Sequence, residues 1–366
     1  MDSGSSRSQI IDYFTDTCQA TPEKAELAAE VAAYEWPVKK AMYKDGISLY
    51  IGIPFCPTRC LYCSFVTCGT RQAAKLIPDY VCALKKEIEY TGRLVAENNR
   101  TTETVYIGGG TPTTLSAKQL DDMLGQIHKS FDLSHCREFT VEAGRPDTIT
   151  PEKLEVLKKH GVNRISINPQ TMNAQTLKII GRAHTPQQIK DAFMLAKNYN
   201  FDCINMDIIA GLPGESAEMF KYTLNEAAGL DPGNITVHTM SIKRSSRLHE
   251  YLSDYELTSG AEVERMIDYA RRFMSDNGYH PYYLYRQKNQ LGNLENVGYS
   301  KDGLDSLYNI YIMEELQTIL ALGCGGVTKT VDPVTDRIER VFNVKEPQDY
   351  LARLDEMLKR KDNIFE

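Results

Sequence analysis

Three cysteines lie close together behind an apolar run near the start of the chain. Cys56, Cys60 and Cys63, in "IGIPFCPTRCLYCSF", are separated by three and then two residues. Thiolates at such spacings bind zinc or an iron–sulfur cluster. A structural zinc site needs four ligands, and the one other cysteine nearby, Cys68, has no partner histidine. We therefore favour a [4Fe–4S] cluster whose fourth iron stays open to a small ligand.

Other polar residues follow the ends of apolar runs that are typical of strands. The loop "GGGTPT" (108–113) follows one run, and single polar side chains end the next four: Glu142, Asn168 with Gln170, Asp207 and His238. Ligands of parallel α/β sheets bind beyond the carboxyl ends of the strands, so we expect these groups to face one cavity. Taken singly, each also has an ordinary explanation as a helix cap, a half-buried histidine or a Gly-rich turn.

The elements that must position these residues alternate between strands and helices. Strands are predicted at 47–53, 103–109, 138–144, 163–168, 202–209 and 234–240. Helices are predicted between them, near 77–95, 116–131, 151–160, 173–199 and 215–230. This alternation indicates βαβ units and an α/β fold, a partial (β/α)6 TIM-like barrel that lacks two units of a complete one.

The remaining segments flank this core. Residues 1–45 are predicted to form an N-terminal helical segment, with a helix from Pro22 to Trp36 that Pro37 ends. Residues 46–240 form the predicted core, and 241–366 a C-terminal α+β appendage. Within the appendage we expect a helix at 260–277, then one short strand and a Gly/Asn-rich loop in "HPYYLYRQKNQLGNLENVGYS".

Composition favours a soluble cytoplasmic enzyme. Charged residues make up 25% and apolar residues 42% of the 366, and the net charge of −7 argues against nucleic acid as a partner. No apolar run approaches the ~20 residues that cross a bilayer, and "MDSGSSRSQI" lacks the apolar core of a secretory signal. In a reducing compartment the nine cysteines are expected to be thiols or metal ligands rather than disulfides.

Several segments together resemble a known family. The spacing CxxxCxxC with Tyr62 before the last cysteine is that of radical S-adenosylmethionine (radical SAM) enzymes. From about 47 to 330, "YIGIPFCPTRCLYCSF", "VYIGGGTPTTL", "VEAGRPDT", "ISINPQTMN", "GRAHTPQQI" and "DIIAGLPGES" resemble the oxygen-independent coproporphyrinogen III oxidase family. The later "LYRQKNQLGNLENVGYS" and "GCGGVTK" are most similar to its coproporphyrinogen dehydrogenase (HemZ-type) branch.

This resemblance implies a [4Fe–4S] cluster and S-adenosyl-L-methionine as cofactors. The cluster would cleave S-adenosylmethionine to a 5′-deoxyadenosyl radical that abstracts hydrogen from the substrate. The implied reaction is the oxidative decarboxylation of coproporphyrinogen III propionates to vinyl groups, giving protoporphyrinogen IX in heme biosynthesis. The expected partners are a tetrapyrrole substrate and reduced flavodoxin or ferredoxin as electron donor, and we expect a monomer.

The resemblance also implies roles for individual residues. Tyr50 would lie beside the cluster, Tyr62 would belong to the cofactor-binding residues, and Arg182 would pair with the carboxylate of S-adenosylmethionine. The other implied contacts are Gly109, Gly110 and Thr111 with its methionine end, Glu142 with its ammonium or sulfonium group, and Gln170 and Asp207 with the ribose hydroxyls. A guanidinium suits a carboxylate because its planar fork makes two bonds. The structural alternative for Arg182 is an ordinary surface arginine.

The sequence also departs from the better known branches. Phe65 occupies the position of a fourth cysteine in the oxidase branch, and "GNLENVGYS" lacks the His-Asn-x-x-Tyr-Trp pattern of the heme-chaperone branch. Members of the HemZ-type branch tend to carry a longer N-terminal region, so we expect part of a domain to be absent here. The alternatives are a heme-binding or heme-transfer chaperone, and a radical SAM enzyme that methylates or opens another tetrapyrrole.

Basic and aromatic residues near the appendage could meet such a substrate. The basic candidates for propionate contacts are Lys243, Arg244, Arg247, Arg286 and Lys288, and the tyrosines that could flank a macrocycle are Tyr282, Tyr283 and Tyr285. A solvated basic loop and one face of a core strand explain the same residues equally well.

Overall fold

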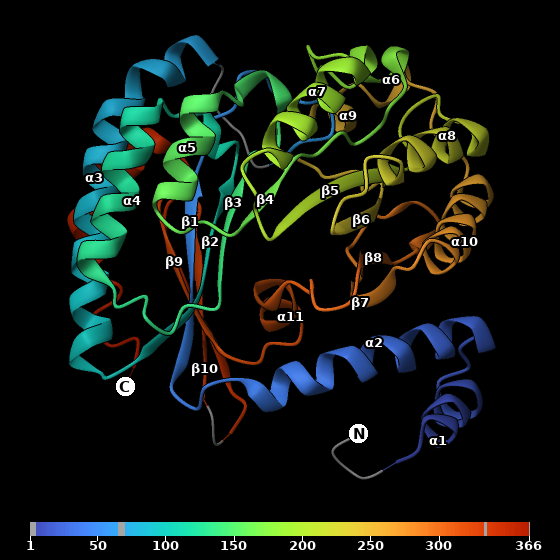
Figure 1. The fold of residues 1–366 in the computed structure, drawn as a ribbon, viewed down its shortest axis with the longest axis horizontal. Helices are drawn as coiled ribbons and strands as arrows, with labels where there is room; N and C mark the ends of the chain where they lie inside the picture. Colours follow the sequence, from blue (N-terminus) through green and yellow to red (C-terminus); the bar gives the residue numbers. More distant parts are fainter. Residues whose placement is uncertain (1–4, 65–69, 333–334, 366) are drawn as a thin grey trace.

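A single mixed sheet runs through the computed structural model, which describes residues 5–64, 70–332 and 335–365 (Figure 1). Its middle is six parallel strands in chain order: β1 (Gly46–Ile53), β2 (Thr101–Gly109), β3 (Glu138–Glu142), β4 (Arg164–Ser166), β5 (Cys203–Ala210) and β6 (Asn234–Thr239). These are the six strands predicted from the sequence, and they confirm the parallel α/β core. Seven of the eight residues of β1 are apolar or glycine, as expected of a strand buried on both faces.

Helices connect the parallel strands as the sequence predicts. They are α3 (Thr70–Glu97), α4 (Ala117–Ser130), α5 (Pro151–Lys159), α6 (Ala174–Ile179), α7 (Pro186–Lys197) and α8 (Ala217–Ala228). The predicted apolar face of α3, which includes Ile77, Leu84 and Ile88, is buried in the core. Short 3-10 turns occupy Pro112–Thr114, Pro146–Thr148, Leu252–Asp254 and Leu291–Asn293.

The helix predicted over 173–199 is two helices, which corrects that prediction. Gly181 has a φ of +76°, a left-handed conformation that ends α6. Thr185 then caps α7, whose first residue is Pro186. The segment between the two helices carries Arg182, so this side chain is presented from a loop at the carboxyl edge of the sheet.

Further strands extend the sheet at both ends. β8 (Asn296–Ser300) pairs antiparallel with β6, and β7 (His280–Tyr285) pairs with β8. On the other side β9 (Thr318–Leu322) runs parallel to β1, followed by β10 (Val327–Val331) and β11 (Ile338–Phe342). The loop predicted in "GNLENVGYS" is wrong in part, because its last five residues are the fully buried strand β8. One sheet thus contains strands from both sides of residue 240, and the predicted domain boundary at that residue stays a prediction.

The remaining helices lie after β6 and around the sheet edges. They are α9 (Arg247–Glu250), α10 (Gly260–Asp276), α11 (Leu307–Met313), α12 (Pro347–Ala352) and α13 (Leu354–Lys359). Helix α10 matches the helix predicted at 260–277. The N-terminus of α11 is held by Glu138, which accepts a hydrogen bond from the Leu307 N–H (2.7 Å).

At the N-terminus, α1 (Arg7–Asp12) and a short π-helix (Tyr13–Thr17) precede α2 (Pro22–Ala41). Helix α2 was predicted to end at Trp36, but it continues through Pro37. Proline removes one helical hydrogen bond, and here α2 lies along β7 (Figure 1), where burial of Leu27 and Val31 compensates for that loss. Among the described helices, none has the length and apolarity of a membrane span.

Candidate functional site

The cysteine loop and the glycine loop meet beyond the carboxyl ends of β1 and β2. The Gly110 N–H donates to the Ile53 carbonyl (2.7 Å), and the Thr111 N–H donates to the Phe55 carbonyl (2.7 Å). The Thr111 hydroxyl lies 3.1 Å from Cys56 Sγ. Three predicted site residues, Cys56, Gly110 and Thr111, are thereby brought together.

The first cysteine is half-buried, in surroundings that disfavour a bare thiolate. Burial raises the pKa of the Cys56 thiol to about 12, although the Thr111 hydroxyl lowers it, and the thiols of Cys60 and Cys63 raise it further. A thiolate at Cys56 therefore needs a cationic centre beside it, which the irons of a cluster supply.

The other two cysteines are fixed by the backbone of their loop. The Cys63 N–H donates to the Cys60 carbonyl (3.2 Å), and the Leu61 N–H donates to the Ile180 carbonyl (3.0 Å) at the end of α6. No three His, Cys, Asp or Glu side chains in the described part of the chain converge as a single metal ion needs. A cubane cluster does not need its ligands to converge on one point, because each thiolate binds a separate iron. Phe65 and Cys68 lie outside the described residues.

Arg145 anchors the cysteine loop, a role the sequence reasoning missed. Its Nη1 donates to Thr58 Oγ1 (2.7 Å), while Nε and Nη2 donate to the two carboxylate oxygens of Asp147 (3.0 and 3.1 Å). His184 is buried beside this pair, with Nδ1 3.8 Å from Asp147 Oδ1. The signal was the Arg-Pro-Asp of "VEAGRPDT", in which the chain enters a 3-10 turn and Asp147 pairs with Arg145, whose guanidinium reaches the loop.

Arg182 brings a half-buried positive charge to the cysteine loop. Its Nη1 donates to the Asn168 carbonyl (2.7 Å), and its Nη2 lies 3.5 Å from the Tyr62 hydroxyl. Its Nε is buried with no hydrogen-bond partner among the described residues. Burial works to lower the pKa of Arg182, but Tyr62 and Cys60 raise it above its ordinary value. A guanidinium with an unused donor fits the carboxylate of an amino-acid ligand.

Glu142 places a half-buried acidic group at the end of β3. The Tyr106 hydroxyl donates to its Oε1 (2.6 Å). Burial and the negative charge of Asp207 raise the pKa of Glu142 to about 7, against the lowering effect of that hydrogen bond. The Glu142 carboxylate lies so close to β2 that only glycine fits at position 108, because a Cβ at Gly108 would lie 2.8 Å from Glu142 Oε1. A carboxylate without a Lys or Arg partner in the described structure fits an ammonium or sulfonium group.

The side chain of Tyr50 on β1 extends toward Gly109 at the end of β2. Gly109 has a φ of +104°, and a Cβ there would lie 3.2 Å from the Tyr50 hydroxyl. The Tyr50 ring stacks on Tyr106 (6.3 Å between centroids), and Tyr106 stacks on Tyr308 of α11 (4.5 Å). Aromatic rings therefore form one side of the site, and the absence of a Cβ at Gly109 leaves room next to the Tyr50 hydroxyl.

Gln170 and Asp207 are joined through their backbones. The Gln170 N–H donates to the Asp207 carbonyl (2.9 Å), with Gln170 in a left-handed conformation (φ +63°). Asp207 Oδ2 lies 3.8 Å from His238 Nε2, and Asn205 donates to Asp207 Oδ1 (2.8 Å). Burial works to raise the pKa of Asp207, but His238 and Asn205 hold it below its ordinary value, so this carboxylate is ionised.

A cavity of about 240 Å³ joins the cysteine loop to these strand ends. Its lining includes Tyr62 and Cys63 from the loop, and Gln170, His238, Lys243 and Tyr285 from the sheet side. The Tyr285 hydroxyl lies 3.3 Å from His238 Nδ1. Of the basic and aromatic candidates for substrate contact, Lys243 and Tyr285 line this cavity, whereas Tyr282 and Tyr283 are packed in the core.

Comparisons with known proteins agree with this arrangement. The family model of the radical SAM superfamily matches residues 50–227. The chain is 44% identical over 351 residues to the oxygen-independent coproporphyrinogen-III oxidase-like protein HemZ of Bacillus subtilis, covering 94% of this chain and 70% of that one. It is 30% identical over 307 residues to the heme chaperone HemW of the same organism, covering 80% and 76%.

A solved structure shares the fold. Coproporphyrinogen III oxidase (HemN) from Escherichia coli, described as a radical SAM enzyme, matches with a TM-score of 0.67 at 24% identity, over 89% of this chain and 73% of that one. The chain belongs to the radical SAM family of coproporphyrinogen-III oxidase-like proteins. This confirms the fold class and the resemblance. The family uses a [4Fe–4S] cluster and S-adenosylmethionine, and the roles of individual site residues stay predictions.

Proposed function

We propose that this radical SAM protein oxidatively decarboxylates propionate side chains of coproporphyrinogen III to vinyl groups, giving protoporphyrinogen IX. The observation that carries the proposal is the meeting of Cys63 with Gln170, His238 and Lys243 around one cavity. One small molecule in this cavity could therefore contact a thiol of the cluster loop, polar side chains at the strand ends and a lysine that can hold a carboxylate. The 44% identity to a coproporphyrinogen-III oxidase-like relative supports the choice of substrate.

The described residues fit both cofactors. Cys56, Cys60 and Cys63 would hold the cluster, and Glu142 and Arg182 would hold the ammonium and carboxylate of S-adenosylmethionine. When bound, the reduced cluster and S-adenosylmethionine together supply a 5′-deoxyadenosyl radical that removes a hydrogen atom from the substrate. The orphan Nε of Arg182 and the uncompensated charge of Glu142 would each gain a partner from such a zwitterionic ligand.

The chain's own part in the reaction is to bind and orient the propionate. Burial lowers the pKa of Lys243, as expected of an ammonium at the cavity wall that has yet to receive an anionic partner. His238 is fixed between Asp207 and Tyr285 and presents a polar ring to the same cavity. Each decarboxylation releases carbon dioxide and leaves one electron, which a one-electron acceptor must take.

The experiment is anaerobic reconstitution with iron and sulfide, followed by reaction of coproporphyrinogen III with dithionite and S-adenosylmethionine. Mass spectrometry should show a product that has lost two carboxyl groups. Cleavage of S-adenosylmethionine without this product would reject the substrate, and transfer of label from methyl-labelled S-adenosylmethionine would indicate a methyltransferase. The Cys60→Ala variant, treated in parallel, should give neither cleavage nor product.

The cellular setting is part of the proposal. We expect a cytoplasmic monomer that receives its electron from reduced flavodoxin or ferredoxin. The ordinary acidic composition supports the cytoplasmic location. Light scattering of the reconstituted protein tests whether it is a monomer. Cleavage of S-adenosylmethionine with reduced flavodoxin in place of dithionite tests the electron donor.

Heme binding is the second candidate, because the chain is 30% identical to a heme chaperone over 80% of its length. The His-Asn-x-x-Tyr-Trp pattern is absent from the corresponding "GNLENVGYS", most of which is buried in β8. A heme titration of the anaerobic protein distinguishes the two candidates. Tight uptake of one heme per chain, without turnover of coproporphyrinogen III, would favour the chaperone.

A further inference from the structure

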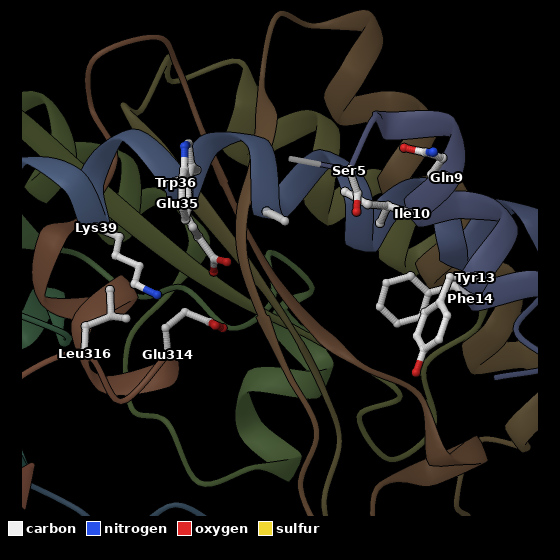
Figure 2. Close-up of a pocket in the computed structure, with 11 residues that line it drawn as sticks. Ser5, Gln9, Ile10, Tyr13, Phe14, Glu35, Trp36, Lys39, Glu314 and Leu316 are labelled. Atoms are coloured by element: carbon white, nitrogen blue, oxygen red, sulfur yellow. The ribbon is translucent and has the colours of Figure 1, made fainter. Parts of the chain in front are cut away.

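A second and larger cavity lies at the opposite edge of the sheet. It measures about 750 Å³, and Figure 2 shows the side chains around it. Its walls come from α1 and the π-helix, from α2, and from the segment between α11 and β9 that contains Glu314 and Leu316. Because α2 precedes the start of β1 and Leu316 precedes the start of β9, this cavity is at the amino ends of the strands. The cysteine loop is at their carboxyl ends.

The main polar feature of this cavity is a buried carboxyl group without a partner. Glu35 is 9% exposed, and its Oε1 has no hydrogen-bond partner among the described residues. In Figure 2 its side chain points from α2 toward Glu314 and Lys39. Burying a polar atom without a hydrogen bond is costly, so such an atom marks a position where a ligand can supply the missing donor.

A second acidic residue makes the cavity suited to positive charge. Burial, followed by the charge of Glu314, raises the pKa of Glu35 to about 8. The pKa of Glu314 is itself raised by burial, with Lys39 lowering it and Glu315 raising it. Besides Glu35 and Glu314 themselves, the charged groups that act on this pair are one cation, Lys39, and one further acid, Glu315. A bound cation between the two carboxyl groups would displace the proton that Glu35 holds at neutral pH.

The rest of the cavity is aromatic and apolar. Trp36, Tyr13 and Phe14 line it, together with Ile10 and Leu316. The Trp36 ring already has Lys40 Nζ 4.7 Å from its centroid, which shows that a cation is accommodated over this indole. The volume is within the range of small-molecule sites, whose walls are mostly apolar with a few polar groups for orientation.

We propose that this cavity binds a small organic ammonium compound with an aromatic or aliphatic body. Its ammonium group lies between Glu35 and Glu314 and donates to Glu35 Oε1. Its apolar body lies against Trp36 and the rings of Tyr13 and Phe14. The site is separate from the cysteine loop and independent of the reaction proposed there.

The chain carries its own probe for this site, because Trp36 is the one tryptophan of the sequence. The test titrates the full chain with 2-phenylethylammonium and follows tryptophan fluorescence. The matched ligands are 2-phenylethanol, which is neutral, and 3-phenylpropanoate, which is anionic. We expect saturable binding of the ammonium, at least about tenfold tighter than the alcohol because of the charged hydrogen bond. The anion should bind more weakly still.

Two variants test the carboxyl group. Glu35→Gln keeps the shape of a side chain that is largely protonated at neutral pH, and it should remove the preference for the ammonium. Glu26→Gln makes the same type of substitution on the exposed side of α2, outside the cavity, and should leave binding unchanged. Since an alkylammonium stays charged below about pH 10, its affinity should rise between about pH 6.5 and pH 8.5 as Glu35 ionises.

Three results would overturn the proposal. They are equal affinity for the ammonium and the alcohol, full retention of binding by Glu35→Gln, and no saturable change in Trp36 fluorescence. If Glu35→Gln unfolds, as its melting temperature would show, Glu314→Gln replaces it, and retained ammonium preference in that variant counts equally against the site. Failure of the tetrapyrrole reaction would leave this test unaffected, because it needs no cluster.

Discussion

Arg145 Nη1 lies 2.7 Å from Thr58 Oγ1, so a buried guanidinium ties the end of β3 to the loop that carries the three cysteines. The same guanidinium holds both carboxylate oxygens of Asp147. Because Thr58 lies between Cys56 and Cys60, this bond fixes the backbone from which two thiols project. The order of the cysteine loop thus depends on a residue in the segment that follows β3.

Replacing Arg145 should loosen the cysteine loop. Arg145→Lys keeps the charge but cannot reach Thr58 and both oxygens of Asp147 together, so it loses one or two charged hydrogen bonds of about 1.5–3 kcal/mol each. We expect a chelator to remove iron from the reconstituted variant several-fold faster than from the parent. Arg340→Lys on the exposed strand β11 is the control. Equal rates of iron loss in both variants would contradict the anchoring role.

The pKa of Glu142 predicts how S-adenosylmethionine binding depends on pH. Since its pKa is raised to about 7, Glu142 is mostly protonated at pH 6 and mostly ionised at pH 8. An ammonium or sulfonium group prefers the ionised form, so the dissociation constant should fall about tenfold from about pH 6 to pH 8. Equilibrium dialysis of the reconstituted protein measures it. Glu142→Gln should bind more weakly with a flat pH profile, and a steep profile in that variant would assign the titration elsewhere.

The parallel core could be predicted because its signals are local. Strand β1 is a run of apolar residues, and the buried face of α3 repeats at helical spacing, so pattern alone identified both. Strand β8 was missed because "NVGYS" contains Asn296 and Gly298, which favour loops in isolation. In the structure the missing side chain of Gly298 admits the ring of Tyr283, since a Cβ there would lie 1.9 Å from it. That partner is a neighbouring strand and is invisible to local patterns.

The candidate site residues were proposed one by one, and their mutual geometry could not be read from the sequence. The cysteines, Glu142, Gln170 and Asp207 were proposed because each ends a predicted strand or belongs to a motif. Arg145 and His184 were missed because their importance comes from contacts between residues that are far apart in the sequence. Arg145 contacts Thr58, and His184 lies beside Asp147. Arg182 was a predicted site residue, but the helix predicted over 173–199 included it. The positive φ of Gly181 places it on a loop, and only the three-dimensional structure shows which carbonyls it reaches.

The glycine loop tolerates no added side chain at its centre. A Cβ at Gly110 would lie 2.6 Å from the Phe55 carbonyl oxygen, at the start of the cysteine loop, and 2.8 Å from that of Ile53, the last residue of β1. Gly110→Ala should lower the free energy of unfolding by a few kcal/mol, at least about 2. In contrast, Gly125→Ala in α4 meets only a His160 atom at 3.9 Å and should stabilise by up to about 1 kcal/mol. Urea denaturation of both apo variants measures the two effects, and similar values would argue against the close approach of the loops.

Removal of one predicted cluster ligand should be distinguishable from removal of an ordinary cysteine. Cys60→Ala leaves two of three thiolates, so anaerobic reconstitution should lose the brown iron–sulfur absorption. Cys82→Ala, at an exposed cysteine of α3, should reconstitute like the parent chain. Iron and sulfide analysis checks both variants. A Cys60→Ala protein with full absorption and four irons per chain would contradict the ligand assignment.

The buried ion pair between Glu87 and Lys361, which lies outside the candidate site, should contribute to the stability of the fold. Lys361 Nζ lies 2.8 Å from Glu87 Oε1, and both side chains are at most 1% exposed. Glu87 also accepts hydrogen bonds from the Gly323 N–H (2.8 Å) and Asn343 Nδ2 (2.8 Å). This carboxylate therefore joins α3 to the loop after β9 and to the C-terminal residues. Lys361→Met removes the cation and leaves a buried charge, which should cost about 3–5 kcal/mol.

The pH dependence of this effect has a definite sign. Burial works to raise the pKa of Glu87, but Lys361 and the hydrogen bonds from Tyr350 and Asn343 hold it below its ordinary value. A lowered carboxyl pKa stabilises the fold above the unfolded pKa of about 4.5, and that stability is lost as the pH falls below it. In Lys361→Met the carboxyl is easier to protonate, so the difference from the parent should be large at pH 7 and shrink toward pH 4. Thermal unfolding of both chains at three pH values measures this, with Lys359→Met on the last turn of α13 as the control. A difference that grows on acidification would show that the ion pair does not stabilise the fold.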